Sequence, residues 1–412
     1  MVLNVIWVGF FLIAFAVGLF KLLVLGDVDV FSRMIASTFD MAKASFDICL
    51  SLAGVLTLWL GIMRVGEKAG AVDLLARLVR PFFRRLFPDV PADHPVHGAM
   101  ILNFSANMLG LDNAATPFGL KAMQQLQELN GGRETASNAQ IMFLVLNTSG
   151  LTLIPVAILA YRSQAGAANP ADVFLPILLT TFFSTVAGLT VVAAVQRIRL
   201  LDPVLLGWLL GLGAAVAGLI TLFVQLPKEQ VETVSTLIAN VTLFSVIAGF
   251  VGLAAFRRVQ AYEAFIDGAK EGFQVVIKIL PYLVALLVAI GVFRSSGAMD
   301  YVVDAVRHVA GWFTSDTRFV DGLPTGLMKP LSGGGARALM VDTMEQHGAD
   351  SFAGRLACTF QGATDTTFYV IAVYFGSVGV RRTRHAIPCG LLADLTAIVA
   401  GTLIAYLFFG EA

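Results

Sequence analysis

The sequence predicts an all-α polytopic membrane protein made of two inverted repeats. Three observations support this: its composition, the length of its apolar segments and a match between its two halves. Of its 412 residues, 57% are hydrophobic and only 14% are charged, against about 25% charged in soluble domains. Several apolar runs exceed the roughly 18 residues that a helix needs to cross a bilayer. The alternating pattern of a membrane β-barrel is absent from the sequence.

Composition also limits the partners. The formal net charge is zero, so nothing indicates nucleic acid, and the three cysteines lie in apolar segments without metal-ligand spacing. We expect no cofactor, and a small-molecule solute and the lipid bilayer as partners, with a homo-oligomer left open. The first apolar segment has no basic residue before Lys21, so we interpret it as a retained transmembrane helix and not a signal peptide.

The distribution of basic residues predicts which segments cross the membrane. Two interrupted stretches, 96–130 and 321–347, contain Gly, Asn, Pro and charged residues. If both are re-entrant hairpins, the basic clusters at 64–85, 197–199, 257–258 and 381–384 share one side, as the positive-inside rule requires. This predicts a multi-pass protein of the bacterial cytoplasmic (inner) membrane with a cytoplasmic N-terminus. The predicted spans lie near 2–25, 44–63, 140–160, 172–196, 203–224, 234–256, 275–293, 353–376 and 386–409.

A shift of 227 positions aligns the two halves. It matches Asp40 to Asp267 and Gly70 to Gly297, with further identities nearby. Each half continues in one order: an interfacial helix (72–87 or 299–313), a hairpin, a broken helix and an intact helix. The segment 203–224 has no counterpart, so an odd number of crossings separates the halves and inverts the second. We therefore predict a first repeat at 1–200, a connecting helix at 201–228 and a second repeat at 229–412.

Each hairpin is predicted to turn at a polar interruption. In the first, a half-helix ends near Leu109 and Pro117 suits the start of the next; Asn113 and Thr116 lie in the turn. In the second, we expect the turn at 332–335, because three glycines permit a tight reversal. A helix starting near Ala336 would then direct its amides at an anionic or carbonyl group. The candidate binding residues here are Lys329, Ser332 and Gly334.

Two spans carry hydroxyl-rich breaks at matching positions. The broken helix 140–160 contains Asn147, Thr148 and Ser149, and the broken helix 353–376 contains the stretch QGATDTT at 361–367. Irregular backbone is tolerated at membrane depth only where protein or a wet cavity satisfies it. The second break adds five candidate binding residues, namely Gln361, Thr364, Asp365, Thr366 and Thr367.

Asp365 is the central candidate. An ionisable residue near the bilayer centre costs roughly 3 kcal/mol, so we expect it to face the bundle interior and meet a partner. A buried ion pair with Lys329 that merely joins the halves is the alternative. Hydroxyls such as that of Ser149 could instead satisfy their own helix carbonyls. We expect a sodium site near Asn113, Asn147 and Asp365, with Na⁺ or H⁺ as the coupling ion.

Longer motifs carry a family resemblance. NMLGLDNAATPFGLKAM (107–123) and NTSGLTLIP (147–155) resemble spore maturation protein A, and KPLSGGGARA (329–338) and ATDTTFYVIAVYFG (363–376) resemble spore maturation protein B. The chain resembles a fusion of the two, within the nucleoside-recognition or gate domain group, which is similar in layout to concentrative nucleoside transporters. The resemblance implies a solute site between hairpin tips and broken helices.

The predicted function is secondary-active transport of a small polar solute, nucleoside-like or amino-acid-like, driven by sodium or protons. A non-transporting membrane assembly or maturation factor is the main alternative, and a channel is another. We do not expect an enzyme, because no histidine lies inside a predicted span.

Overall fold

The computed structural model describes residues 2–91, 93–109, 112–198, 200 and 202–410, apart from the side chains of 2, 3, 51, 112–114, 228, 229, 232, 278 and 279. Among the described residues, seven helices are long and apolar enough to span a membrane, so the chain is an all-helical multi-pass membrane protein. These helices are α1 (Val2–Val24), α2 (Val30–Lys68), α8 (Phe174–Gln196), α9 (Pro203–Gln225), α10 (Lys228–Phe256), α11 (Ala261–Ser295) and α17 (Ala386–Phe409).

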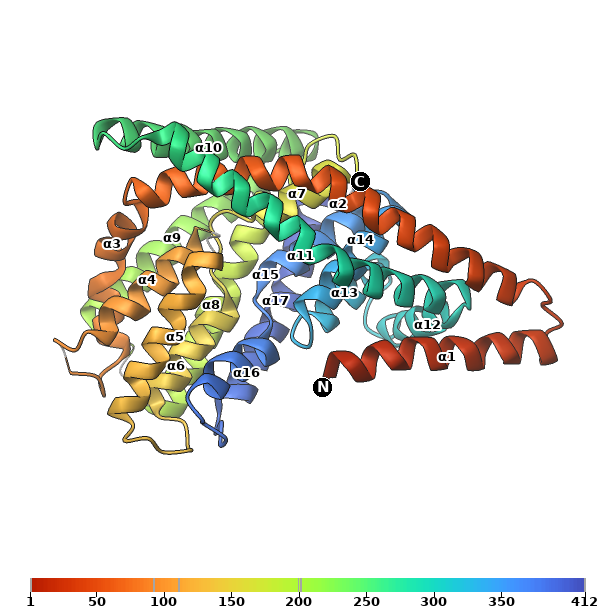
Figure 1. Cartoon of the computed structure of the whole chain (residues 1–412), viewed down its shortest axis with the longest axis horizontal. Helices are drawn as coiled ribbons and strands as arrows, with labels where there is room; N and C mark the ends of the chain where they lie inside the picture. The colour runs from red at the N-terminus through yellow and green to blue at the C-terminus, as the bar shows by residue number, and fades with distance from the viewer. Residues whose placement is uncertain (1, 92, 110–111, 199, 201, 411–412) are drawn as a thin grey trace.

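The order of elements in the first half recurs in the second (Figure 1). Helix α2 and its counterpart α11 are each followed by an amphipathic helix, a helical hairpin, a helix pair separated by a break, and a long apolar helix. The remaining first-half elements are α3 (Ala71–Leu86), α4 (Val96–Met108), α5 (Asp112–Leu129), α6 (Asn138–Ser149) and α7 (Val156–Gln164). Their second-half counterparts are α12 (Ala298–Ala310), η1 (Arg318–Gly322) with α13 (Leu323–Met328), α14 (Gly333–His347), α15 (Phe352–Ala363) and α16 (Thr367–Ser377).

The two longest helices pack against each other in opposite directions. Helices α2 and α11 have 39 and 35 residues, so they extend well beyond the predicted spans 44–63 and 275–293. A Cβ on Gly268 would lie 2.5 Å from the Cβ of Arg64, and one on Gly291 would lie 2.4 Å from Cγ of Met41. Positions 41 and 268 correspond under the 227-residue shift, as do 64 and 291. The same contact is therefore made twice, once from each half.

Small residues also let α8 and α17 cross closely. A Cβ on Gly188 would lie 3.3 Å from that of Ala393, and one on Gly401 would lie 3.3 Å from Cγ2 of Thr180. Ser184 adds a hydrogen bond from its hydroxyl to the carbonyl of Ala393, 3.2 Å long. Small residues spaced four apart are the usual means of close helix packing in membranes. This crossing is again antiparallel and again uses corresponding faces of corresponding helices.

The amphipathic helices begin at corresponding left-handed glycines. Gly70 (φ 80°) precedes α3 and Gly297 (φ 85°) precedes α12, a conformation that suits glycine. Helix α3 buries an apolar face against α4 and leaves basic residues exposed. Pro81 lies inside α3 without ending it. One apolar and one basic face are typical of a helix that lies in the interface plane.

Both hairpins turn differently from the sequence-based expectation. Pro117 lies inside α5 and does not begin it, since the helix already starts at Asp112. In the second hairpin the reversal occupies 329–332, and Gly333 is already the first residue of α14. Ser332 caps that helix, because its hydroxyl accepts from the amide of Gly335 at 3.0 Å. The prediction of a glycine turn at 332–335 is therefore wrong.

The glycines instead allow other chain segments to pack closely against the start of α14. A Cβ on Gly333 would lie 2.5 Å from Oγ1 of Thr366, and one on Gly335 would lie 3.1 Å from Cγ of Met328. The absence of a side chain at 333 thus lets the start of α14 lie against the break before α16, and its absence at 335 lets α14 pack closely on α13.

Candidate functional site

Local sequence signals define the two chain breaks. Helix α6 starts with a capping box formed by Ser137 and Gln140, and it ends at Gly150, which has φ 54°. In the second half, Ser351 caps α15, and Thr364 ends it in an extended conformation. The breaks therefore cover 150–155 and 364–366, within the stretches that the sequence predicts.

The two breaks touch each other. The amide of Asp365 donates to the carbonyl of Thr148 over 2.8 Å. A Cβ on Gly150 would lie 3.0 Å from the amide nitrogen of Asp365 and 3.3 Å from the carbonyl carbon of Thr364. Gly150 is thus required both by its positive φ and by the approach of the other chain segment. Because each break satisfies part of the other, irregular backbone is supported inside the bundle.

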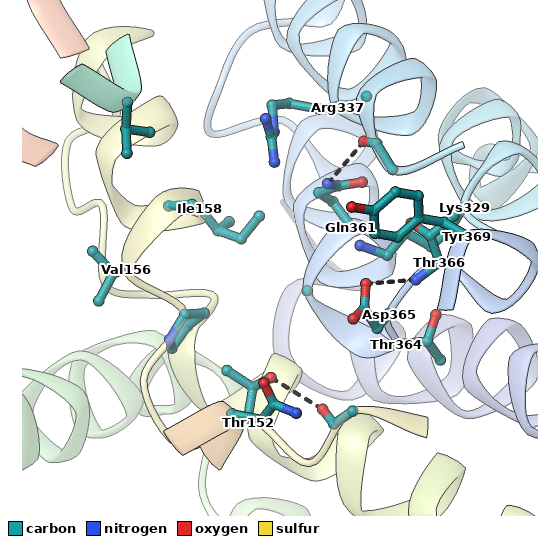
Figure 2. Close-up of a pocket in the computed structure, with 18 of the residues that line it drawn as sticks. Thr152, Val156, Ile158, Lys329, Arg337, Gln361, Thr364, Asp365, Thr366 and Tyr369 are labelled. Carbon is teal, nitrogen blue, oxygen red and sulfur yellow. Dashed lines mark hydrogen bonds between the residues drawn. The ribbon is translucent and has the colours of Figure 1, made fainter. Parts of the chain in front are cut away.

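A cavity of about 1060 Å³ opens beside this contact. Figure 2 shows Lys329, Gln361 and Asp365 on one wall, facing Val156 and Ile158 across the space. The second half therefore contributes a polar wall and α7 a more apolar one. Eight predicted binding residues line the cavity: Asn147, Lys329, Ser332, Gly334, Gln361, Thr364, Asp365 and Thr366.

Asp365 faces the cavity. It is exposed there, and its Oδ1 accepts from the amide of Thr366 at 2.6 Å. Its setting is an open cavity between helices of the bundle. On the neighbouring surface, Asn147 is held by two hydrogen bonds, accepting from Asn107 and donating to the carbonyl of Phe143, each 2.8 Å long.

Gln361 is buried on the polar wall with half of its amide unused. Its side chain is 5% exposed, its Nε2 donates to the carbonyl of Gly333 at 3.4 Å, and its Oε1 has no partner among the described residues. Lys329 is 8% exposed, and the Arg337 guanidinium also reaches this region. The start of α14 lies between them, so positive charge and amide dipoles converge on one part of the cavity.

Four predicted residues do not line the cavity. Thr148 and Ser149 donate to carbonyls of their own helix, at Val145 and Leu146, which is the alternative that the sequence left open for Ser149. Thr367 donates to Asp394, and Thr116 lies exposed on α5. The side chain of Asn113 lies outside the described residues, and the other two residues of the expected sodium site, Asn147 and Asp365, both line the cavity.

The sequence-based prediction missed several charged residues. Arg64, Glu67 and Glu271 all line the cavity. Asp394, in the first half of α17, is buried next to Thr364 and Thr367. An ionisable residue within a span is itself a signal of function. Asp394 lies in the predicted span 386–409, so the sequence could have identified it.

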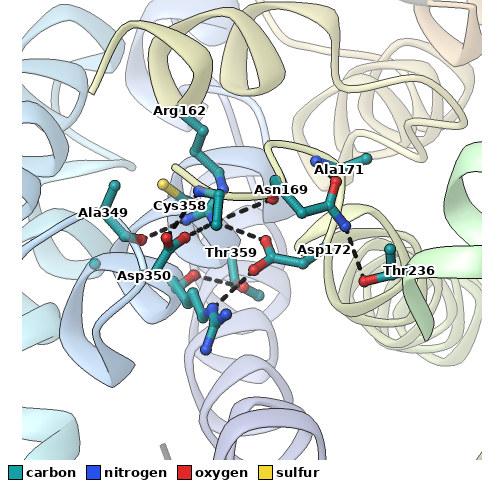
Figure 3. Close-up of polar contacts among 12 residues, drawn as sticks. Arg162, Asn169, Ala171, Asp172, Thr236, Ala349, Asp350, Cys358 and Thr359 are labelled. Carbon is teal, nitrogen blue, oxygen red and sulfur yellow. Dashed lines mark hydrogen bonds and ion pairs between the residues drawn. The ribbon is translucent and has the colours of Figure 1, made fainter. Parts of the chain in front are cut away.

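A buried ionic network joins the halves beyond one end of the cavity (Figure 3). Arg162 at the end of α7 is fully buried and pairs with Asp172 at 2.8 Å and Asp350 at 2.9 Å. It also donates to the carbonyl of Ala349 at 2.6 Å, and Arg355 of α15 binds the other oxygen of Asp172 at 2.8 Å. The network thus ties α7 and the segment before α8 to the α14–α15 connection and to α15.

Comparisons with known proteins agree with the repeated layout. A family model described as "Nucleoside recognition" (Gate) matches residues 49–166 and 276–381, more than half of the chain. Spore maturation protein B of Bacillus subtilis (strain 168) is 44% identical over 167 residues, which are 40% of this chain and 92% of that protein. Spore maturation protein A of the same organism is 43% identical over 155 residues, 38% of this chain and 79% of that protein. No solved structure matches significantly. The chain therefore belongs to the nucleoside-recognition (Gate) family, as a fused spore maturation protein A/B-like member.

Proposed function

We propose that the protein is a secondary-active transporter of a small polar solute, either nucleoside-like or amino-acid-like. The observation that carries this proposal is the direct contact of two chain breaks, one from each half, at the wall of a single large cavity. Broken helices that meet near the midplane between repeats are the usual site of solute binding in secondary transporters. The family description, nucleoside recognition, points the same way.

The arrangement of corresponding helices supports inverted repeats. Helices α2 and α11 pack antiparallel, and so do α8 and α17. If these helices cross the bilayer, a two-fold axis relating the halves lies in the membrane plane. The second half then enters the membrane upside down, the two hairpins are re-entrant from opposite sides, and the N-terminus is cytoplasmic in a bacterial inner membrane.

The cavity favours a solute with one polar edge and one apolar face. Asp365 provides a negative group, and Lys329, Arg337 and the start of α14 provide positive ones. The opposite wall, with Val156 and Ile158, suits an apolar surface. A nucleoside has such a shape, as does a zwitterionic amino acid, whose two charges also match the two charged regions.

The experiment is a thermal-stability screen of the purified full-length protein. Nucleosides, amino acids and small organic acids are added singly, in sodium chloride or choline chloride. A solute that binds the folded state raises the melting temperature, and we expect this shift to be lost in Asp365→Asn. A matched control is Asp316→Asn, which changes a carboxylate in an exposed loop and should keep the shift.

An assembly or maturation role is the second candidate, because both relatives are named as spore maturation proteins. It predicts that no solute stabilises the protein. It also predicts that folded Asp365→Asn and Lys329→Ala variants restore the phenotype of a deletion strain. Transport predicts that both variants fail in that assay.

A further inference from the structure

Asp394 is a buried carboxyl group that the proposed solute site does not use. It lies in α17, one of the spanning helices, and is only 4% exposed. Its Oδ2 accepts from the Thr367 hydroxyl at 2.7 Å, and its Oδ1 has no hydrogen-bond partner among the described residues. The side chains that interact directly with this carboxyl group, Thr367 and Thr364, are thus neutral hydroxyls.

The surroundings leave little to stabilise a negative charge at this position. Lys329 and Asp365 are the charged groups that act on Asp394, and their effects oppose each other. The faces of α6 and α8 that approach this part of α17 present the uncharged Thr148 and Ser184, and α9 has no charged residue. A buried charge without a full set of partners costs several kcal/mol, so such a group is normally neutralised.

We propose that Asp394 is a proton-binding site. One proton from water in the cavity adds to Oδ1 and converts the carboxylate to a carboxyl group, and its return to water reverses the step. The proton can pass between the cavity and Asp394 at Thr364, because this residue lines the cavity and also interacts with Asp394.

The position of Thr367 links this proton to the chain break. Thr367 is the first residue of α16, and its hydroxyl holds Oδ2. A Cβ on Gly390 would lie 2.8 Å from Cγ2 of Thr367, so the two helices are closely fitted here. Loss of the proton would leave a buried charge at this contact and favour a conformation in which water from the cavity reaches it. This coupling rests on the proposed transport function, whereas proton binding itself does not.

Infrared difference spectroscopy of the full-length protein in liposomes tests the proposal, with pH as the only variable and no solute added. At a pH where exposed carboxyl groups are ionised, the wild type should show the carbonyl stretch of protonated carboxyl groups. Buried groups such as Asp172 and Asp342 can add to this band, so the contribution of Asp394 is the part that Asp394→Asn removes, and it should disappear at high pH. Asp365→Asn should keep that contribution. Thr367→Val should shift the frequency of the Asp394 band, because the hydrogen bond to Oδ2 is lost. This variant retains Asp394, so it tests the assignment even if Asp394→Asn fails to fold.

Three outcomes would overturn the proposal. One is a wild-type spectrum without such a band, and another is a band of undiminished intensity in Asp394→Asn. The third is loss of the band when sodium chloride replaces choline chloride at constant pH, which would assign the site to sodium. Since no solute is present, each outcome leaves the transport proposal standing, and a failed solute screen leaves the band unaffected.

Discussion

At the scale of single residues, the contact between the two breaks depends on the missing side chain of Gly150. Its φ of 54° is left-handed, and the backbone of 364–365 lies where a Cβ would project. The left-handed conformation costs a residue with a Cβ roughly 1–2 kcal/mol. The collision with another chain segment adds to this cost, because backbone on both sides is held by packing.

Gly150→Ala should therefore lower the free energy of unfolding by more than the left-handed backbone conformation alone would. The matched control is Gly131→Ala, because Gly131 also has a positive φ (66°) but no atom within 4 Å of the added Cβ. We expect both variants to melt at lower temperature in detergent, with the larger decrease for Gly150→Ala. Equal decreases would contradict the assignment of a close backbone contact at 150.

The residue scale also shows what the sequence could reveal about the site. Asp365 and Lys329 stand out because charged residues are rare in apolar surroundings, and both line the cavity. Thr148 and Thr367, in the two broken helices, look like equally good binding residues in the sequence. In the structure the Thr148 hydroxyl donates to the carbonyl of Val145 and the Thr367 hydroxyl donates to Asp394. Periodicity does not determine these directions, because the helices restart after each break at an angle set by tertiary packing.

At the scale of elements, the interruptions are predictable and their geometry is not. The sequence places both breaks correctly, because hydroxyl and glycine clusters inside apolar spans are incompatible with a continuous lipid-facing helix. It misassigns the Gly333–Gly335 segment, because glycine serves equally in a turn and where another segment approaches closely. Only the position of Thr366 distinguishes these two roles.

The ionic network at Arg162 is the clearest stability determinant between elements. Asp172→Asn would leave two buried arginines without their shared carboxylate, a type of change that costs roughly 3–5 kcal/mol. Glu134→Gln is the control. The side chains of Glu134 and its partner Arg381 are 61% and 79% exposed, and such an exposed ion pair adds little to the free energy of unfolding. We expect a clear decrease in melting temperature for Asp172→Asn alone. Similar melting temperatures for the two variants would show that the network does not hold the halves together.

At the scale of the whole molecule, the order of elements is recoverable from the sequence because both halves share glycines and charges at a fixed shift. Gly70 and Gly297, for example, both precede an amphipathic helix in the left-handed conformation. The length of α2 and α11 was not recoverable. Their first turns carry polar residues such as Arg33, Asp40 and Lys270, which a hydropathy pattern excludes from a span although the helix continues through them.

The central claim is that the two halves lie in the membrane in opposite orientations, so that their breaks meet at one cavity. Positions 77 and 304 correspond under the 227-residue shift and are both exposed at the surface of an amphipathic helix. Single-cysteine variants Arg77→Cys and Asp304→Cys can therefore report the side of each half. The three native cysteines are buried and should contribute little background.

The measurement is labelling of these variants with a membrane-impermeant maleimide, in cells with an accessible cytoplasmic membrane, before and after permeabilisation. The inverted arrangement predicts that Cys at 304 reacts in intact cells, whereas Cys at 77 reacts only after permeabilisation. Reaction of both positions from the same side would contradict the inverted arrangement and, with it, the proposed transport mechanism.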